Sequence, residues 1–233
     1  MSCVDEWIET NMTKTEQQFL AAKEALLKEK LSQYPDPWSL VPGQESVKRA
    51  IVVAAVQGHT VAGFGPSGCY ADELTAGAAL LGVPMMTALC CPCGNYTDPI
   101  RACSCSVSKI SQWTRKHLFI LRDSAEIHVE ISSVPSSIIL AHQNRKGYGS
   151  TTIEMVRPEL KDIGALPPVD WAQGDDITSI AKQAMNELGI TGEQLRIIRN
   201  VARSIAALAH SENVKIEHFL EAIQYRRLNR LCS

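Results

Sequence analysis

The chain has 233 residues, enough for one large domain or two small ones, and its 45% hydrophobic and 21% charged residues are ordinary for a soluble globular protein. A formal net charge of −2 gives the molecule no basic field, so strong non-specific binding to nucleic acid or anionic membrane is not expected. No stretch reaches the roughly 18 to 20 apolar residues of a membrane span, and acidic residues stand where a secretory signal would be basic. A cytoplasmic protein without a membrane partner is therefore predicted.

The first part of the chain predicts a helical extension followed by an α/β unit. Residues 13–31 have the spacing of an amphipathic helix, which would pack on the main domain or on a partner, and they lie in an N-terminal extension of residues 1–37. Gly43–Gln57 is the next expected helix. A buried strand over Thr60–Phe64, a glycine-rich turn and a helix over Asp72–Leu81 follow. This is the order of elements around a phosphate-binding loop.

The middle of the chain predicts two more strands with a helix between them. Val83–Leu89 is expected to be a short strand, and Val107–Leu121 a basic helix. The alternation of apolar and polar residues over Ala125–Ile131 predicts a half-exposed strand with His128 on its exposed or cleft-facing side. Residues 146–175 are rich in Pro, Gly, Ser and polar groups and indicate an arm that connects two domains.

The last third of the chain is helical by pattern. Thr191 and Gln194 have the spacing of a capping box at the start of one helix. A core domain over residues 38–145 would thus be followed, after the arm, by a helical lid domain over residues 176–233. Three helices are expected to form the lid as a small bundle: Ile177–Leu188, Thr191–Leu208 and Ile216–Leu228.

The turn before the helix at Asp72 has the outline of a phosphate-binding loop. Gly65, Pro66 and Gly68 form its framework. A working loop ends in Gly-Lys-Thr or Gly-Lys-Ser, in which the lysine contacts the β and γ phosphates and the hydroxyl binds Mg²⁺. At this place the chain has Tyr-Ala-Asp, residues 70–72, so the cation and the hydroxyl are missing and the aspartate would repel a polyphosphate.

Eight cysteines in a chain of this class indicate free thiols or metal ligands rather than a disulfide framework. Cys91, Cys93, Cys103 and Cys105 form two Cys-x-Cys pairs with nine residues between them. Four thiolates brought together by a hairpin suit tetrahedral Zn²⁺ at about 2.3 Å from each sulfur, and Arg101 is near enough in the sequence to offset their charge. The alternative interpretation is four free, partly buried thiols.

Five stretches of the chain carry a resemblance to one family. Residues 91–105 read Cys-Pro-Cys-Gly-Asn-Tyr-Thr-Asp-Pro-Ile-Arg-Ala-Cys-Ser-Cys, which is close to that family's cysteine signature, and residues 41–59 resemble the helix and turn before its phosphate loop. Residues 127–130, 201–206 and 218–226 resemble the last core strand and the lid. Over about residues 38–230 the chain is similar to the magnesium-chelatase-like AAA+ ATPases of the ComM/YifB type, hexameric motors associated with branch migration of recombining DNA.

The chain departs from this family where ATP would be hydrolysed. Only 17 residues separate Asp72 from Cys90, whereas the family places most of its ATPase core there, including the acidic strand that binds magnesium. Leu89 stands where an asparagine would sense the γ-phosphate, and Ser124 stands where the family has an arginine. Since an arginine finger contributes about 10³ to 10⁵ in rate where it operates, hydrolysis is not expected, and neither ATP nor Mg²⁺ is an expected cofactor.

The predicted fold class is α/β: a truncated AAA+-like (P-loop) core with a cysteine hairpin, followed by a C-terminal three-helix lid. The resemblance implies a remnant nucleotide site of Gly65, Pro66 and Gly68 with one lid arginine, either Arg199 or Arg203. Sheet edges left by the shortened core would need covering by the N-terminal helix or by another chain.

The function expected from these observations is that of a non-catalytic, zinc-stabilised interaction module. It would associate with a full-length AAA+ relative or with copies of itself, and it would reach DNA only through a partner. The alternative is an ATP-binding AAA+ motor subunit that acts on DNA within a hetero-hexamer, where a neighbour supplies the missing residues. A third reading is a decayed gene product without a selected role.

Overall fold

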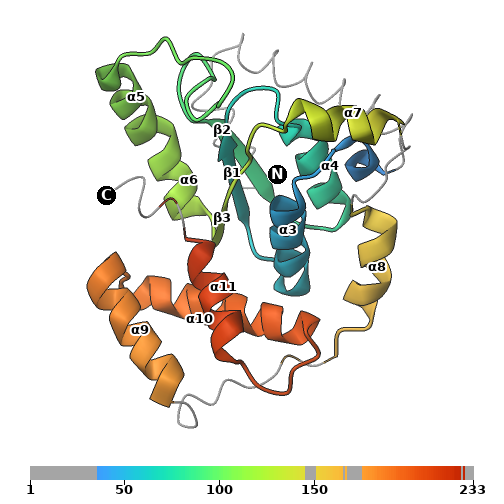
Figure 1. The fold of residues 1–233 in the computed structure, drawn as a ribbon. Coiled ribbons are helices and arrows are strands. Elements are labelled where there is room, and N and C mark those ends of the chain that lie inside the picture. The colour runs from blue at the N-terminus through green and yellow to red at the C-terminus, as the bar shows by residue number, and fades with distance from the viewer. Residues whose placement is uncertain (1–35, 145–150, 165, 167–174, 227, 229–233) are drawn as a thin grey trace, which may run out of the picture.

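The structure, a computed structural model, describes residues 36–144, 151–164, 166, 175–226 and 228. The helix predicted over residues 13–31 lies outside these ranges. Within them the chain forms a small sheet flanked by helices, with a helical lid at one end of the sheet (Figure 1). In the described ranges, no helix combines the length and the apolar character needed to cross a membrane.

Three parallel strands make up the sheet: β1 (Val61–Gly65), β2 (Met85–Leu89) and β3 (Ile127–Glu130). Their order in space is β2-β1-β3, so β1 lies in the centre and all five of its residues are buried. Helix α4 (Ala71–Leu80) connects β1 to β2. The predicted succession of strand, glycine-rich turn, helix and strand between residues 60 and 89 is therefore confirmed.

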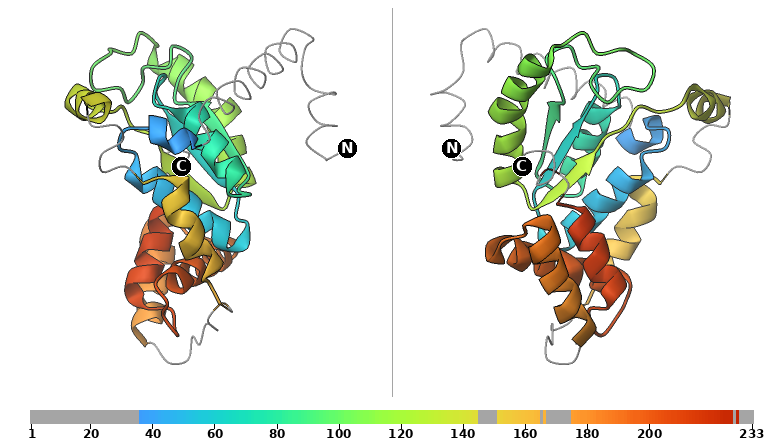
Figure 2. Two further views of the ribbon diagram at one scale, coloured as in Figure 1. Left: turned by 90° about the vertical axis from the view of Figure 1, so that its right-hand side faces the viewer. Right: turned by 60° about the vertical axis from the view of Figure 1, so that its left-hand side comes forward.

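Helices cover both faces of the sheet, as Figure 2 shows. Helix α3 (Glu45–Gln57) and α4 lie on one face, where they pack against Val61. On the other face, Leu118 and Leu121 pack against Ala62 and Phe64 of β1. These two leucines belong to one continuous helical rod, which consists of three segments: α5 (Val107–Trp113), the π-helical η2 (Thr114–Leu118) and α6 (Phe119–Ser124).

The prediction that β3 is half exposed is wrong. His128 is fully buried (0% exposed), because the chain after the last lid helix runs alongside the strand. The backbone N–H of His128 donates to Tyr225 O at 2.7 Å, and Arg226 Nη1 donates to Ala125 O at 2.9 Å. Burial, followed by the nearby Arg226 charge, lowers the pKa of His128 to about 3, so its imidazole stays neutral.

The three C-terminal helices predicted from the sequence are confirmed. They are α9 (Asp175–Leu188), α10 (Gly192–Leu208) and α11 (Ile216–Gln224), and they are named the lid here. Thr191 caps α10 by accepting a hydrogen bond from the backbone N–H of Gln194, whose side chain accepts one in return from the backbone of Thr191, so the predicted capping box is present. Helix α10 packs on α3, which fixes the lid against the core.

Three helical segments were not predicted. They are η1 (Pro37–Leu40), α7 (Ser136–Asn144) and α8 (Ile153–Lys161). Helix α8 lies within the arm predicted over residues 146–175 and packs on α3, and its first backbone N–H donates to Asp36 Oδ2 at 2.8 Å. The described part of the arm is therefore a packed element of the core rather than only a connection.

Candidate metal centre

The four predicted ligand cysteines come together after β2. The Sγ atoms of Cys91, Cys93, Cys103 and Cys105 all lie within 4.8 Å of one another. Cys91 Sγ is 3.4 Å from Cys93 Sγ and 3.7 Å from Cys103 Sγ, and the last two sulfurs are 3.6 Å apart. Sulfurs of a tetrahedral site with metal–sulfur bonds of about 2.3 Å are about 3.8 Å apart. The cluster can therefore hold a metal ion.

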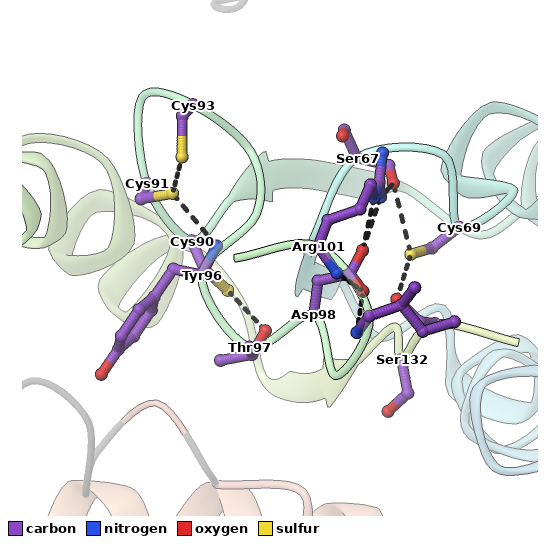
Figure 3. A network of polar contacts seen from close by, with 12 residues as sticks. Ser67, Cys69, Cys90, Cys91, Cys93, Tyr96, Thr97, Asp98, Arg101 and Ser132 are labelled. Carbon is purple, nitrogen blue, oxygen red and sulfur yellow. Dashed lines mark hydrogen bonds and ion pairs between the residues drawn. The ribbon is translucent and has the colours of Figure 1, made fainter. Parts of the chain in front are cut away.

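Backbone turns on both sides of the cluster position these cysteines. Gly94 adopts a left-handed conformation with φ +76°, and its N–H donates to Cys91 O at 3.0 Å. The N–H of Tyr96 donates to Cys91 Sγ at 3.2 Å (Figure 3). Asp98 then closes the second turn by accepting the N–H of Ile100 at 2.9 Å. The segment from residue 91 to residue 105, here named the cysteine hairpin, is thus shaped by its own hydrogen bonds.

The environment of Cys93 favours its thiolate. Backbone hydrogen bonds from Asn95 and Ser104, followed by the contact with Cys91, lower the pKa of Cys93 to about 5. Cys90, which directly precedes the hairpin, differs from it. This thiol is 4% exposed in the apolar cluster behind β1, and burial raises its pKa to about 11. Cys90 also lies outside the group of four converging sulfurs, so it is a core residue and not a fifth ligand.

The cysteine hairpin is bonded to the loop between β1 and α4. The N–H of Ser67 in that loop donates to Gly94 O at 2.7 Å. Arg101 Nη2 donates to Ser67 O and also pairs with Asp98 Oδ2 at 2.7 Å (Figure 3). Hydrogen bonds from the backbone N–H groups of Ile100 and Arg101 lower the pKa of Asp98 to about 2. Both backbone polar groups of Ser67 are therefore bonded to the hairpin.

The β1–α4 loop borders a cavity of about 420 Å³. Residues 65–73 line it together with Thr87, Ala88, Leu89 and Ile131. Among these lining residues the charged ones are Asp72 and Glu73, both acidic. Tyr70, just before α4, has a left-handed backbone with φ +63°, which is strained for a residue with a Cβ.

The residues predicted for a remnant nucleotide site fall in two places. Gly65, Pro66 and Gly68 line the cavity, while Arg203 lies on α10 and does not line it. A packing reason accounts for one of the glycines. A Cβ on Gly65 would lie 2.0 Å from Ile131 O, so the backbones at this point are too close for any side chain.

Sequence reasoning missed a polar cluster that joins the core to the lid. His59 Nδ1 lies 2.8 Å from Glu126 Oε2, and His59 Nε2 lies 3.0 Å from Ser204 Oγ. The order of groups resembles a Ser-His-acid triad. Ser204 is fully buried, however, and its hydroxyl also accepts from Gln57 Nε2 at 2.7 Å. With no room for a substrate, the cluster serves to hold α10 against the core.

The comparisons concern the lid. Residues 169–226 match the family model described as magnesium chelatase, subunit ChlI C-terminal. No curated protein matches the chain. The matched segment includes the three lid helices, which pack on the α/β core through α3. Residues 169–226 of the chain are therefore similar to the C-terminal domain of the magnesium chelatase subunit ChlI.

Proposed function

We propose that the chain is a non-catalytic interaction module of the magnesium-chelatase-like family, stabilised by a zinc ion and lacking a working ATP site. The observation that carries the proposal is the cluster of four thiols within 4.8 Å. Mg²⁺ and Ca²⁺ take oxygen ligands, whereas a tetrahedral all-sulfur set suits zinc or iron. Because the protein would fill all four positions, the metal would have no open position for substrate, as in structural zinc sites.

The contacts around the cluster support a structural role for the metal. Cys91 follows β2 directly, while Cys105 is followed by Ser106, whose side chain caps α5 by accepting the N–H of Lys109. A metal on both residues would tie the end of the sheet to the start of the helical rod on its face. The rod supplies Leu118 to the core behind β1. Loss of the metal is thus expected to weaken the packing of the helical rod on the sheet.

The β1–α4 loop supports the proposal that ATP does not bind. A phosphate loop needs free backbone N–H groups that point at the phosphates and a lysine that neutralises them. Here the N–H of Ser67 is already bonded to Gly94 O. The charged residues that line the cavity, Asp72 and Glu73, would repel a polyphosphate. Both effects act against the same ligand.

The proposed partner is a full-length relative or another copy of the chain, with DNA reached only through that partner. Support comes from the lid, which is the part that matches the family model. Helix α10 is anchored to the core by the contact between Ser204 Oγ and His59 Nε2 at 3.0 Å, which fixes the orientation of the lid that a partner would recognise.

Metal analysis and calorimetry on the purified full chain test this function. One zinc per chain by mass spectrometry of the metal, together with no heat of binding on titration with MgATP, is the expected result. Iron in place of zinc would contradict the assignment of the metal. Steady ATP turnover that disappears in a Gly68→Glu variant, but not in an exposed control such as Glu212→Gln, would contradict the loss of the ATP site.

The alternative is an ATP-binding AAA+ subunit of a hetero-hexamer acting on DNA. The cavity beside the β1–α4 loop is the observation in its favour, because it remains open at the carboxyl ends of β1 and β2. This alternative requires nucleotide at a subunit boundary. Copurification of a hexamer that contains ATP would support it, and a homogeneous complex without nucleotide would exclude it.

A further inference from the structure

A second cavity, of about 490 Å³, lies between the sheet and the helical rod and is here named the rod cavity. Phe64 in β1, Cys90 directly after β2 and Glu130 at the end of β3 line its sheet side. Open α/β sheets bind ligands just outside the carboxyl ends of their strands, and small-molecule sites have volumes of about 300–1,000 Å³. The position and the size of the rod cavity therefore both suit a small ligand.

The wall opposite the sheet is one face of the rod. Its lining residues recur every three or four positions, as on one side of a helix: Val107, Ile110, Ser111, Thr114, Arg115, Leu118 and Phe119. This wall includes the π-helical η2, and π-helical turns are frequent at functional sites. At the rim, Val107 is 84% exposed and Tyr96 of the cysteine hairpin is 44% exposed. A ligand in the cavity would cover part of this apolar surface.

The deep part of the rod cavity is apolar. Phe64, Cys90 and Leu118 are almost completely buried and belong to one hydrophobic cluster. The thiol of Cys90 stays neutral, because burial raises its pKa to about 11. These residues offer no charge to a ligand, so the part of a ligand that enters most deeply should be an apolar group.

Two charged side chains of opposite sign line the rod cavity: Arg115 on the rod and Glu130 on the sheet. Strand alternation explains the position of Glu130. Ile127 and Val129 pack in the core on the α3 side, so Glu130 projects to the rod side. None of the ion pairs within the described ranges joins Arg115 to Glu130. A ligand with one anionic and one cationic group would thus be complementary to both walls.

Thr97 of the cysteine hairpin also lines the rod cavity, and its backbone is strained. Its φ of +75° is rare for a β-branched residue. Strained conformations of this kind cluster at ligand sites. The hydroxyl of Thr97 lies 3.9 Å from Cys90 Sγ (Figure 3). Together with the hydroxyls of Ser111 and Thr114, it gives the cavity hydrogen-bonding groups beside its apolar surface.

We propose that the rod cavity binds a small zwitterion with an apolar side chain, the chemistry shared by a free apolar amino acid and an apolar dipeptide. Arg115 would hold the carboxylate through its planar fork of N–H donors. Glu130 would accept from the ammonium group, since a carboxylate has lone pairs for several donors. The apolar side chain would lie against Phe64 and Leu118. This inference goes beyond the proposed function, which gives the rod cavity no role.

Calorimetric titration of the full chain with L-phenylalanine and with L-leucyl-L-phenylalanine is the first test. Saturable binding is expected, and the tighter ligand distinguishes an amino acid from a dipeptide. Forms of that ligand without the carboxylate or without the ammonium group should bind at least tenfold more weakly, the effect of about one lost charge-assisted hydrogen bond. For phenylalanine these forms are phenethylamine and 3-phenylpropionate; for the dipeptide they are its amide and its acetylated form. Equal binding of all three forms, or no binding of either zwitterion at about 10 mM, would overturn the proposal.

Two variants assign the binding to the rod cavity. Arg115→Gln should weaken the zwitterion at least tenfold and leave the form without a carboxylate unaffected. Glu130→Gln should weaken the zwitterion and leave the form without an ammonium group unaffected. Lys116→Gln is the matched control, because Lys116 is exposed on the rod but does not line the cavity, so its affinity should not change.

The Arg115 variant carries the test alone if Glu130→Gln does not fold, because Arg115 is exposed and its replacement is expected to leave the fold intact. An unchanged affinity in Arg115→Gln would place the ligand elsewhere. Equal losses in Arg115→Gln and Lys116→Gln would mean that the positive charge of the rod attracts the ligand without a defined site. Either result overturns the proposal.

Discussion

Two loops follow the carboxyl ends of the neighbouring strands β1 and β2, and they differ in which binding residues they contain. The cysteine hairpin after β2 has four thiols arranged for a metal. The β1–α4 loop has the framework of a phosphate loop, but acidic groups border its cavity. Packing accounts for at least part of that framework, since Gly65 meets Ile131 O at a distance that excludes a Cβ. A glycine pattern can thus arise from backbone packing, whereas four converging thiols have no comparable packing reason.

The largest effect is expected from removing a ligand. Cys91→Ser should reduce the zinc content from one to near zero and destabilise the fold by several kcal/mol, since structural zinc contributes about 10–16 kcal/mol of apparent binding energy in small domains and here part of the core would persist. Treatment of the wild type with a strong chelator should produce the same shift. Metal analysis and thermal unfolding measure both outcomes.

Cys69→Ser is the matched control for this prediction. Cys69 is a buried thiol of the β1–α4 loop and lies outside the group of four. Its contacts are weak, at 3.8 Å to Ser67 O and 4.0 Å to Ser133 Oγ. The variant should retain its zinc. Equal loss of zinc in both variants would mean that the hairpin is not the metal site.

The second prediction tests whether the glycines of the β1–α4 loop are needed for packing, by comparing the stability cost of a Cβ at Gly65 and at Gly68. Gly65→Ala forces a Cβ against Ile131 O and should cost about 2–3 kcal/mol, in the range of overpacked cores. Gly68→Ala faces open space and meets only the strain of φ +76°, about 1 kcal/mol. Urea unfolding of both variants gives the comparison. A larger cost at Gly68 would show that the loop is shaped by something other than the contact with Ile131.

The third prediction concerns the contact between the two loops. Arg101→Ala removes the donor to Ser67 O and the partner of Asp98, but the arginine side chain is 49% exposed, so the cost should be about 1 kcal/mol or less. Zinc should stay bound. Faster amide exchange at Ser67 is the expected local effect, with Arg101→Lys intermediate. Loss of zinc from the alanine variant would show that the arginine supports the cluster itself.

Local patterns sufficed for the parts of the molecule that depend on near neighbours. The spacing of Cys91, Cys93, Cys103 and Cys105 predicted a cluster, because a hairpin can join two nearby pairs. The periodicity of the lid predicted its three helices, and the capping box at Thr191 is present. In each case the interacting residues lie close together in the sequence.

Contacts between distant segments were not predictable in this way. His128 was expected to be exposed or cleft-facing because its strand alternates, but the chain at Tyr225 and Arg226 covers it from almost 100 residues away. Helix α8 was missed because Pro158 lies inside it. The bond from Ser67 to Gly94 depends on how β1 and β2 sit side by side, which no local pattern encodes.

The smallest effect is expected from restoring the phosphate-loop residues. The triple change Tyr70→Gly, Ala71→Lys and Asp72→Thr supplies the lysine and hydroxyl that such a loop requires. We expect no measurable MgATP binding by calorimetry, because Ser67 N–H remains bonded to Gly94 O and Glu73 still borders the cavity. Tyr70→Gly alone is the folding control: relief of the side chain at φ +63°, about 1 kcal/mol, is offset by the packing that Tyr70 loses against the core, so a folded protein of similar stability is expected. Saturable ATP binding by the triple variant would contradict this expectation, because it would show that the three side chains at residues 70–72 alone prevent the wild-type loop from binding ATP. Its absence in a folded protein would place the cause in the backbone, where the cysteine hairpin already accepts the Ser67 N–H that a phosphate would need.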